Sequence, residues 1–425
     1  MTPSTRRGFF DTAVPPPVPV PVPEPNDSTF TIRVPPTTPP RFVRRGFSGT
    51  GTTTRIAKFS PEEYDPSMLS VGIVGLPNVG KSTLYNALTA GGAEVSNYPF
   101  TTIACNIGVV PVPDPRLQAL ERALKPEKTT PCAIRFIDIA GLVEGASRGE
   151  GLGNQFLGEI RQVDAIVHLI RNFAKSDVSH VFSDVDPVRD AEVIDTELML
   201  ADLEVLERAI AKRAKDWQTH PADHVAEKRR MTAWKESLER GAQLRSLDLD
   251  DLDLRDLKSA GLLTGKPVLY VANVASDKEA AEVDGLRQRE PGAPLLAIDA
   301  ELELELSELE PDERAEFMTE LGIEEPGLNR LVRAAFDLLG LISFYTVVKN
   351  KLQAWEIPAG THASAAAGKI HSDMEKGFVR AKVVAADELV EVGDLHAIQS
   401  AGHMRTIGKD HEIEDGDVVE FLFSK

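Results

Sequence analysis

The chain has 425 residues, enough for two or three domains, and its 42% hydrophobic and 27% charged residues are typical of a globular protein. A formal net charge of −19 argues against a protein that binds nucleic acid over most of its surface. It does not exclude a local basic patch. No apolar run approaches the roughly 18 residues of a membrane span, so we expect no membrane association. The two cysteines, Cys105 and Cys132, predict no disulfide framework and favour a reducing, cytoplasmic location.

The first 67 residues predict an extended, solvated N-terminal segment. Residues 1–60 carry eight basic and three acidic side chains, and a Pro-rich stretch runs from Pro15 to Pro23. Such a chain buries too little apolar surface to form a core. Three interpretations stay open: a disordered tail, a transit peptide, or sequence upstream of a true start at Met68. A transit peptide needs an amphipathic helix, which a Val-Pro run cannot form.

A phosphate-binding loop is the most specific feature of the sequence. Residues 75–82 read Gly-Leu-Pro-Asn-Val-Gly-Lys-Ser, after the apolar run 69–74 and before a helical segment, 83–89. A strand, a G-x-x-x-x-G-K-S loop and a helix in this order form a P-loop, whose backbone N–H groups and helix N-terminus hold phosphate. Lys81 is the predicted catalytic cation, reaching the β- and γ-phosphates, and Ser82 is predicted to hold Mg²⁺. The predicted nucleotide-binding residues here are Leu76, Pro77, Asn78, Val79, Gly80, Lys81, Ser82 and Thr83.

Two later segments complete the predicted phosphate and metal site. The polar loop 96–102 ends in two threonines, and Thr102, in preference to Thr101, is expected to contact Mg²⁺ and the γ-phosphate. A hydrophobic strand ends in Asp138, which is expected to bind Mg²⁺ through water. Gly141 completes a D-x-x-G pattern, and its N–H is the predicted catalytic sensor of the γ-phosphate.

The residue after D-x-x-G departs from the pattern of Ras-type GTPases. Those enzymes place a Gln there to orient the attacking water, whereas this chain has Leu142, which cannot form a hydrogen bond. Another group or a bound cation must therefore position the water. The Asn78 amide, inside the P-loop, is a candidate contact for a monovalent cation.

The segment expected to bind the base also departs from the GTPase pattern. After the strand at 267–272 the chain reads Asn-Val-Ala-Ser from Asn273, where GTPases have N-K-x-D. Ser276 thus replaces the carboxylate that pairs with guanine, and Asp277 lies one residue late. Unpaired guanine donors cost roughly 1–3 kcal/mol, so Asn273 and Val274 are predicted to bind adenine.

Two further regions break the alternation of strands and helices. Residues 197–265 predict a helical hairpin inserted into a nucleotide domain made of residues 68–196 and 266–340, because apolar residues recur at helical spacing on both sides of His220-Pro221. Residues 341–425 change to turns and short strands. There, a candidate RNA-binding patch consists of Lys369, His371, Lys376 and Arg380. His371 is expected to be structural or to contact RNA, since no nucleophile or metal-ligand spacing accompanies it.

Four motifs together resemble the Obg-like ATPases (YchF family). They are the P-loop, Asn97-Tyr-Pro-Phe-Thr-Thr, Val109-Val-Pro-Val-Pro-Asp-Pro-Arg-Leu and Asp138-Ile-Ala-Gly-Leu-Val-Glu-Gly-Ala-Ser. The resemblance covers roughly residues 68–425. It implies an α/β P-loop NTPase core that is G-domain-like, an inserted helical coiled coil, and a C-terminal β-grasp (TGS) domain. The family also has a hydrophobic residue at the position of Leu142.

The resemblance implies a Mg²⁺-dependent ATPase, often supported by K⁺. Its expected role is a nucleotide-gated switch that docks on the ribosome, on the large subunit or its RNA. Two alternatives stay open: a GTPase of the same fold, and a ribosome-docking protein with incidental hydrolysis. The chain departs from the family at Ser276, at Asp299-Ala300 in place of Ser-Ala, and at Ala104-Cys105 in place of an acidic-proline pair. The oligomeric state is not predicted.

Overall fold

The computed structural model describes residues 68–90, 94–97, 106–139, 152–173, 182, 184–275, 283–289 and 292–424. Several predicted features lie outside these residues. They are the N-terminal segment 1–67, Thr101, Thr102, Gly141, Leu142, Ser276 and Asp277.

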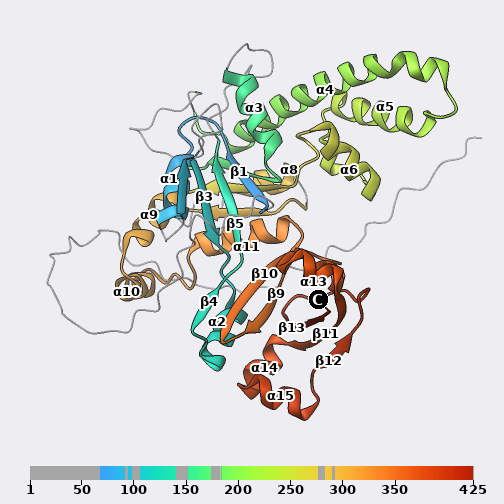
Figure 1. Ribbon diagram of the computed structural model, residues 1–425. Coiled ribbons are helices and arrows are strands. Elements are labelled where there is room, and N and C mark those ends of the chain that lie inside the picture. Colours follow the sequence, from blue (N-terminus) through green and yellow to red (C-terminus); the bar gives the residue numbers. More distant parts are fainter. Residues whose placement is uncertain are drawn as a thin grey trace, which may run out of the picture. The chain divides into compact units, whose positions relative to one another are not determined.

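A seven-stranded sheet carries the nucleotide-binding motifs, with strand order β2-β3-β5-β1-β6-β7-β8. Its strands are β1 (Ser70–Val74), β2 (Glu94–Asn97), β3 (Asn106–Pro111), β5 (Ala133–Asp138), β6 (Ala165–Arg171), β7 (Val268–Asn273) and β8 (Leu295–Ile298). Strands β5, β1, β6, β7 and β8 run parallel, while β3 pairs antiparallel with β2 and β5. Parallel strands end on the same edge of a sheet, so the P-loop after β1 and the ends of β5 and β7 lie on one edge (Figure 1). Asp138 ends β5 and Asn273 ends β7.

Every residue of the central strands β1, β6 and β7 is buried, because helices cover both faces of this sheet. These helices include α1 (Lys81–Ala90), α3 (Leu152–Gln162), α8 (Asp284–Arg289), α9 (Ala300–Glu308) and α11 (Gly327–Leu338). Between α9 and α11 lies α10 (Pro311–Leu321), which has no buried residue. The apolar face predicted for α11 is buried, with Leu331, Val332, Ala335 and Phe336 in the core. The buried Glu303 carboxylate accepts hydrogen bonds from the N–H groups of Gly327 and Leu328, and so satisfies the start of α11.

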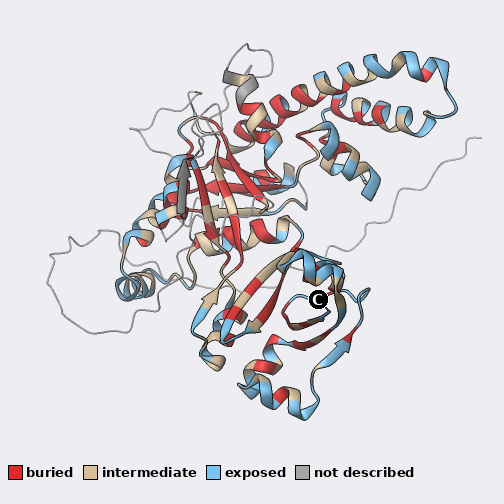
Figure 2. Ribbon diagram, in the orientation of Figure 1, coloured by how far each residue is buried: buried red, intermediate tan, exposed pale blue. Residues whose placement is uncertain are grey.

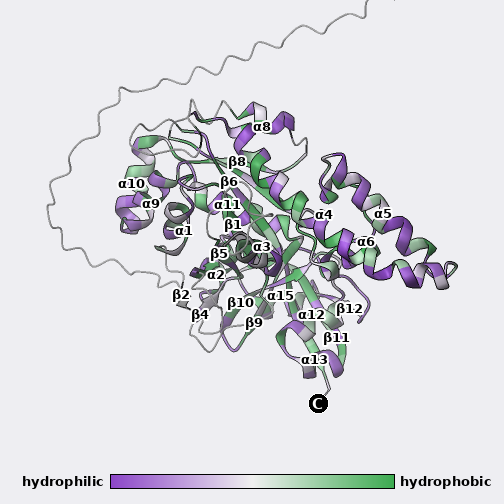
Figure 3. Cartoon of the chain, turned by 90° about the horizontal axis from the view of Figure 1, so that it is seen from above, coloured by the Kyte–Doolittle hydropathy of each residue, from purple (hydrophilic) through white to green (hydrophobic). Residues whose placement is uncertain are grey.

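A helical hairpin interrupts the nucleotide-binding part. It consists of α4 (Pro187–Thr219) and α5 (Val225–Glu239), followed by η3 (Leu244–Ser246) and α6 (Asp251–Ala260). Asp186 caps α4 by accepting hydrogen bonds from the N–H groups of Val188 and Arg189. Buried residues lie along the root of α4 and the face it shares with α5, and the outer turns are exposed and hydrophilic (Figures 2 and 3).

A second hydrophobic cluster holds the arms of this hairpin together. Trp217, Met231 and Trp234 are its largest members, each at most 7% exposed. At the root, the fully buried Asp202 accepts 2.7 Å hydrogen bonds from the N–H groups of Leu263 and Thr264. The hairpin is thus attached to the sheet through a buried carboxylate as well as through apolar packing. No helix in the described part of the chain is both long and apolar enough to cross a bilayer.

The C-terminal sheet has six strands in the order β12-β11-β13-β9-β10-β4. They are β4 (Lys128–Thr130), β9 (Leu341–Val348), β10 (Lys351–Pro358), β11 (Phe378–Ala385), β12 (Arg405–Ile407) and β13 (Asp417–Phe423). The helices of this region are α12 (Ala363–Ile370), α13 (Ser372–Lys376), α14 (Ala386–Val392) and α15 (Leu395–Ala401). β9 and β13 pair in parallel between antiparallel neighbours, which is the pattern of a β-grasp module.

One strand of this C-terminal sheet comes from the sequence assigned to the nucleotide domain. β4 pairs in parallel with β10, and the preceding helix, α2 (Pro115–Leu124), contacts α14. The side chain of Arg116 donates two hydrogen bonds to Asp415, at 2.8 and 3.1 Å. The Tyr345 hydroxyl donates to Asp114, which also caps α2. Burial alone would raise the pKa of Asp114, but its hydrogen bonds from Arg116 and Tyr345 hold it below its usual value.

Candidate nucleotide-binding site

Close contacts with neighbouring strands explain the two glycines of the P-loop. A Cβ atom on Gly75 would lie 2.4 Å from the backbone oxygen of Leu169 in β6. Gly80 has φ +102°, and a Cβ there would lie 2.3 Å from the side-chain nitrogen of Asn273. Asn78 also has positive φ, at 63°, which an asparagine tolerates better than most residues. The loop is therefore held tightly against β6 and β7.

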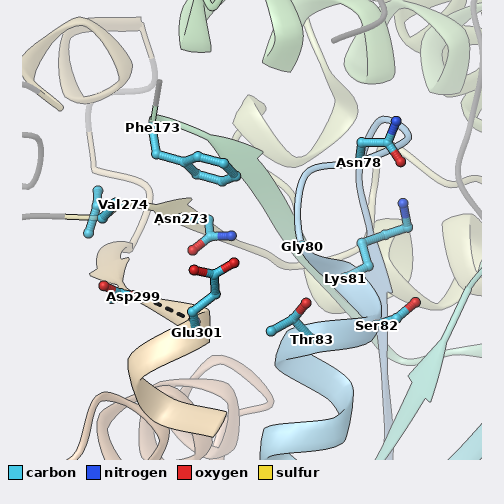
Figure 4. A pocket seen from close by; sticks show the side chains of 11 residues that line it. Asn78, Gly80, Lys81, Ser82, Thr83, Phe173, Asn273, Val274, Asp299 and Glu301 are labelled. Atoms are coloured by element: carbon cyan, nitrogen blue, oxygen red, sulfur yellow. Dashed lines mark hydrogen bonds between the residues drawn. The ribbon is translucent and has the colours of Figure 1, made fainter. Parts of the chain in front are cut away.

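A pocket of about 460 Å³ opens beside this loop (Figure 4). Its volume lies in the range of small-molecule sites. P-loop residues line one end, and residues that follow β6, β7 and β8 line the other. The lining residues are Asn78, Gly80, Lys81, Ser82, Thr83, Phe173, Asn273, Val274, Ala275, Asp299 and Glu301.

The Lys81 side chain is folded onto its own loop. Its Nζ donates hydrogen bonds to the carbonyl oxygens of Gly75, at 3.1 Å, and Leu76, at 2.9 Å. Burial lowers the pKa of Lys81 to about 8, and the nearby negative charge of Asp138 opposes that shift only in part. The buried ammonium group is therefore paired mainly with neutral carbonyl oxygens. A negatively charged phosphate oxygen in their place would stabilise its charged form more strongly.

Asp138 and Ser82 place two oxygen ligands next to Lys81. Burial raises the pKa of Asp138, while Lys81 and a hydrogen bond from Ser82 oppose the rise. A carboxylate and a hydroxyl are hard donors that fit Mg²⁺, which keeps several waters and takes few protein ligands. Among the residues that the structure describes, no group of three or more His, Cys, Asp or Glu side chains could hold a metal ion by itself. The donor set therefore suits a Mg²⁺ ion completed by water and phosphate.

Asn273 joins three segments at the end of the pocket. Its Nδ2 donates to the carbonyl oxygen of Val79 at 2.9 Å, and its Oδ1 accepts from the N–H of Ala300 at 3.1 Å. Asp299 caps α9 by accepting hydrogen bonds from the N–H groups of Glu301 and Leu302. The Asn273 amide thus fixes the P-loop relative to the start of α9.

Comparisons with known proteins identify the family. A model described as a 50S ribosome-binding GTPase matches residues 70–203, and the model of the YchF GTPase C-terminal domain, described as a protein of unknown function, matches residues 341–424. The ribosome-binding ATPase YchF of Pasteurella multocida is 46% identical over 357 residues, 83% of this chain and 98% of the relative. The Bacillus subtilis protein of that name is 45% identical over 364 residues, 84% and 99% of the two chains. The chain belongs to the YchF family.

A solved YchF structure supports the same conclusion. The YchF GTPase of Schizosaccharomyces pombe has a TM-score of 0.74 and 32% identity, and the match covers 84% of this chain and 99% of that one. The resemblance inferred from the four motifs is therefore confirmed, as is the α/β P-loop fold. The YchF relatives carry both descriptions, ATPase and GTPase.

The structure brings together many of the residues that the sequence singled out. Seven predicted binding residues line the pocket: Asn78, Gly80, Lys81, Ser82, Thr83, Asn273 and Val274. Leu76 and Val79 are only 2% and 1% exposed in the core, so they offer backbone atoms alone, and Pro77 does not line the pocket. The predicted roles of Thr102 and Gly141 fall on residues outside those described.

Sequence reasoning missed part of the far end of the pocket. Phe173, Ala275 and Glu301 line it, and Asp299, noted earlier only as a departure from the family, lines it too. Phe173 follows β6 as Val274 follows β7, so a search of every parallel strand end would have found it. The guanidinium of Arg171 stacks 4.5 Å from the Phe173 ring centroid and supports its position.

Proposed function

We propose that this YchF-family chain hydrolyses ATP to ADP and phosphate and that its nucleotide state controls docking on the ribosome. The observation that carries the proposal is the pocket in which Lys81, Ser82 and Asn273 converge beside an intact P-loop. The Pasteurella and Bacillus relatives, which match over nearly their whole length, are named ribosome-binding ATPases. The family model over residues 70–203 points to the large subunit or its RNA, and thus to the cytoplasm.

The proposed chemistry is positioning and charge neutralisation, without a covalent intermediate. Lys81 would leave the carbonyl oxygens of Gly75 and Leu76 and bind the β- and γ-phosphates. Ser82 and Asp138, with Thr102, would hold Mg²⁺, which when bound neutralises charge on the phosphate oxygens. The Gly141 N–H would contact the γ-phosphate.

The position of the attacking water needs a separate account. Leu142 cannot orient water, so we assign that task to backbone groups and to K⁺ held near the amide of Asn78. That side chain lines the pocket from the P-loop. Replacing K⁺ by Na⁺ in the assay tests this assignment, and we expect slower turnover.

We propose ATP as the substrate because of the residues at the end of the pocket where the base would bind. Both atoms of the Asn273 amide already bind the protein, and Phe173 and Val274 offer apolar faces to a purine. Ser276 lacks the carboxylate that would pair with guanine. A GTPase remains the second candidate, since the fission-yeast relative is described as one and Glu301 adds a carboxylate to the lining.

Calorimetric titration with Mg²⁺ and ATP, GTP or ADP tests the substrate. We expect ATP to bind about tenfold more tightly than GTP, or about 1.4 kcal/mol. Equal or tighter GTP binding would favour the GTPase. Lys81→Ala should abolish turnover and leave the fold intact, as judged by thermal melting.

Sedimentation with ribosomes tests the switch. Wild-type protein with ATP or ADP, and Lys81→Ala protein, should differ in the bound fraction. Nucleotide-dependent binding with no turnover above background would instead identify a docking protein with incidental hydrolysis.

A further inference from the structure

Four exposed lysines form a surface on the C-terminal sheet, which we call the lysine corner: Lys125, Lys128, Lys349 and Lys351. Lys125 ends α2, Lys128 begins β4, and the other two belong to the tip and the second strand of the β9–β10 hairpin. The two ribbon views both show α2, β4 and this hairpin side by side (Figures 1 and 3).

Backbone pairing makes the lysine corner continuous although its residues are far apart in the sequence. Lys128 and Lys351 are direct partners in the parallel pairing of β4 with β10. The N–H of Glu127 donates to the carbonyl oxygen of Asn350 at 2.8 Å. Like charges placed opposite each other in a sheet are destabilising, so packing alone does not explain this pair.

Three of the four charges of the lysine corner have no ion-pair partner among the described residues. Lys125, Lys349 and Lys351 form no ion pair with any described residue, and all three are exposed. Glu121 and Glu127 are the acidic residues that neighbour them along α2 and its connection to β4. Counting only Lys125, Lys349 and Lys351, three ammonium groups stand against these two carboxylates, so the surface keeps a net positive charge.

The tip of the β9–β10 hairpin has a lysine in a backbone conformation that lysine disfavours. Lys349 and Asn350 form its two-residue loop, with φ of 49° and 60°. Such a turn favours Asn-Gly, and a left-handed conformation costs a residue with a side chain about 1–2 kcal/mol. Next to it, Val348 is 60% exposed. The tip thus carries the ammonium group of Lys349 in an unfavourable backbone conformation and the exposed apolar side chain of Val348 beside it.

The charge of the rest of the chain makes this surface unusual. The net charge of −19, with +5 in residues 1–60, leaves −24 for residues 61–425. The basic patch predicted from the sequence is partly used internally: Lys369 pairs with Glu356 at 2.9 Å, and the His371 ring caps α13. A polyanion is repelled by most of the molecule and attracted at the lysine corner.

We propose that the lysine corner binds the phosphate backbone of an RNA. The inference rests on the proposed docking to the ribosome and names the surface that makes contact. Ammonium groups on flexible stems bind phosphates as point charges, without needing the fixed geometry of an arginine fork. A projecting hairpin tip with one aliphatic side chain suits an exposed RNA strand or groove edge.

The test compares two triple variants of the full chain in binding to purified ribosomes with ATP. One is Lys125→Gln, Lys349→Gln, Lys351→Gln. The matched control, with the same loss of charge on the helical hairpin, is Lys212→Gln, Lys215→Gln, Lys228→Gln. Those three lysines are also exposed and form no ion pair with a described residue. Affinity is measured over a range of salt concentrations, and ATP binding and thermal melting are measured for each variant.

We expect the lysine-corner variant to bind about tenfold or more weakly, with a salt slope shallower by about 2–3, since each phosphate contact contributes about 0.7–0.9. ATP binding should be unchanged, and the control should bind as wild type does. Equal binding by the lysine-corner variant would overturn this inference and leave the proposed function standing. Weaker binding with an unchanged slope would point to a protein partner and overturn the RNA assignment. Wild-type protein that binds ribosomes in no nucleotide state would overturn the proposed function itself.

Discussion

Nucleotide affinity should fall as the pH rises from 7.5 to 9, because Lys81 loses its proton in that window. Burial lowers the Lys81 pKa to about 8 in the nucleotide-free protein. About three-quarters of the molecules then carry the charge at pH 7.5 and about one-tenth at pH 9. Phosphate should restore the pKa to its ordinary value or higher, so binding above pH 8 takes up a proton. The predicted loss of affinity is about eightfold, or about 1.2 kcal/mol.

Calorimetry with Mg²⁺-ADP measures both quantities and avoids the titration of the γ-phosphate. At pH 8.5, two buffers with different ionisation enthalpies should reveal uptake of about 0.8 proton per nucleotide. Lys81→Arg is the control, because a guanidinium stays charged over this range and its affinity should not depend on pH. Equal wild-type affinity at both pH values, without proton uptake, would refute the reasoning. An eightfold loss in Lys81→Arg would assign the effect to another group.

Three experiments with four substitutions test contacts described above. Gly80→Ala places a methyl group 2.3 Å from the Asn273 side chain and should weaken nucleotide binding more than tenfold in a titration; unchanged affinity would show that the loop can shift. Asn273→Ala removes the hydrogen bonds to Val79 and Ala300 and should lower the free energy of unfolding in urea by about 1–3 kcal/mol, whereas no change would mean that water replaces both. A double-mutant cycle of Arg116→Ala and Asp415→Ala should give a coupling of about 1 kcal/mol that declines in high salt; strictly additive effects would contradict the pairing.

Local signals account for the parts of the site that the sequence predicted. The P-loop depends on a strand, two glycines and a helix start within a few residues, and Asp138 and Asn273 both end apolar strands. The start of α4 also had a local signal, since Asp186 and Pro187 are a cap and a first-turn proline, but the predicted hairpin began only at residue 197. That signal was present in the sequence and was missed.

Long-range contacts account for what could not be predicted. Glu301 reaches the pocket because β8 lies next to β7 in the sheet, and the order of strands in a sheet cannot be read from the periodicity of one sequence. The pairing of β4 with β10 joins residues more than 200 positions apart. The folding of Lys81 onto Gly75 and Leu76 likewise depends on burial by the assembled sheet.

The strand that crosses from one region to the other limits how this protein can be divided. A fragment cut at Leu341 would lose β4 and expose the backbone of β10 as a bare sheet edge, at a site where Lys351 would be its main protection. It would also leave Asp415 without Arg116. Such a fragment is at risk of edge-to-edge association, whereas a fragment that begins before Asp114 keeps both contacts in place.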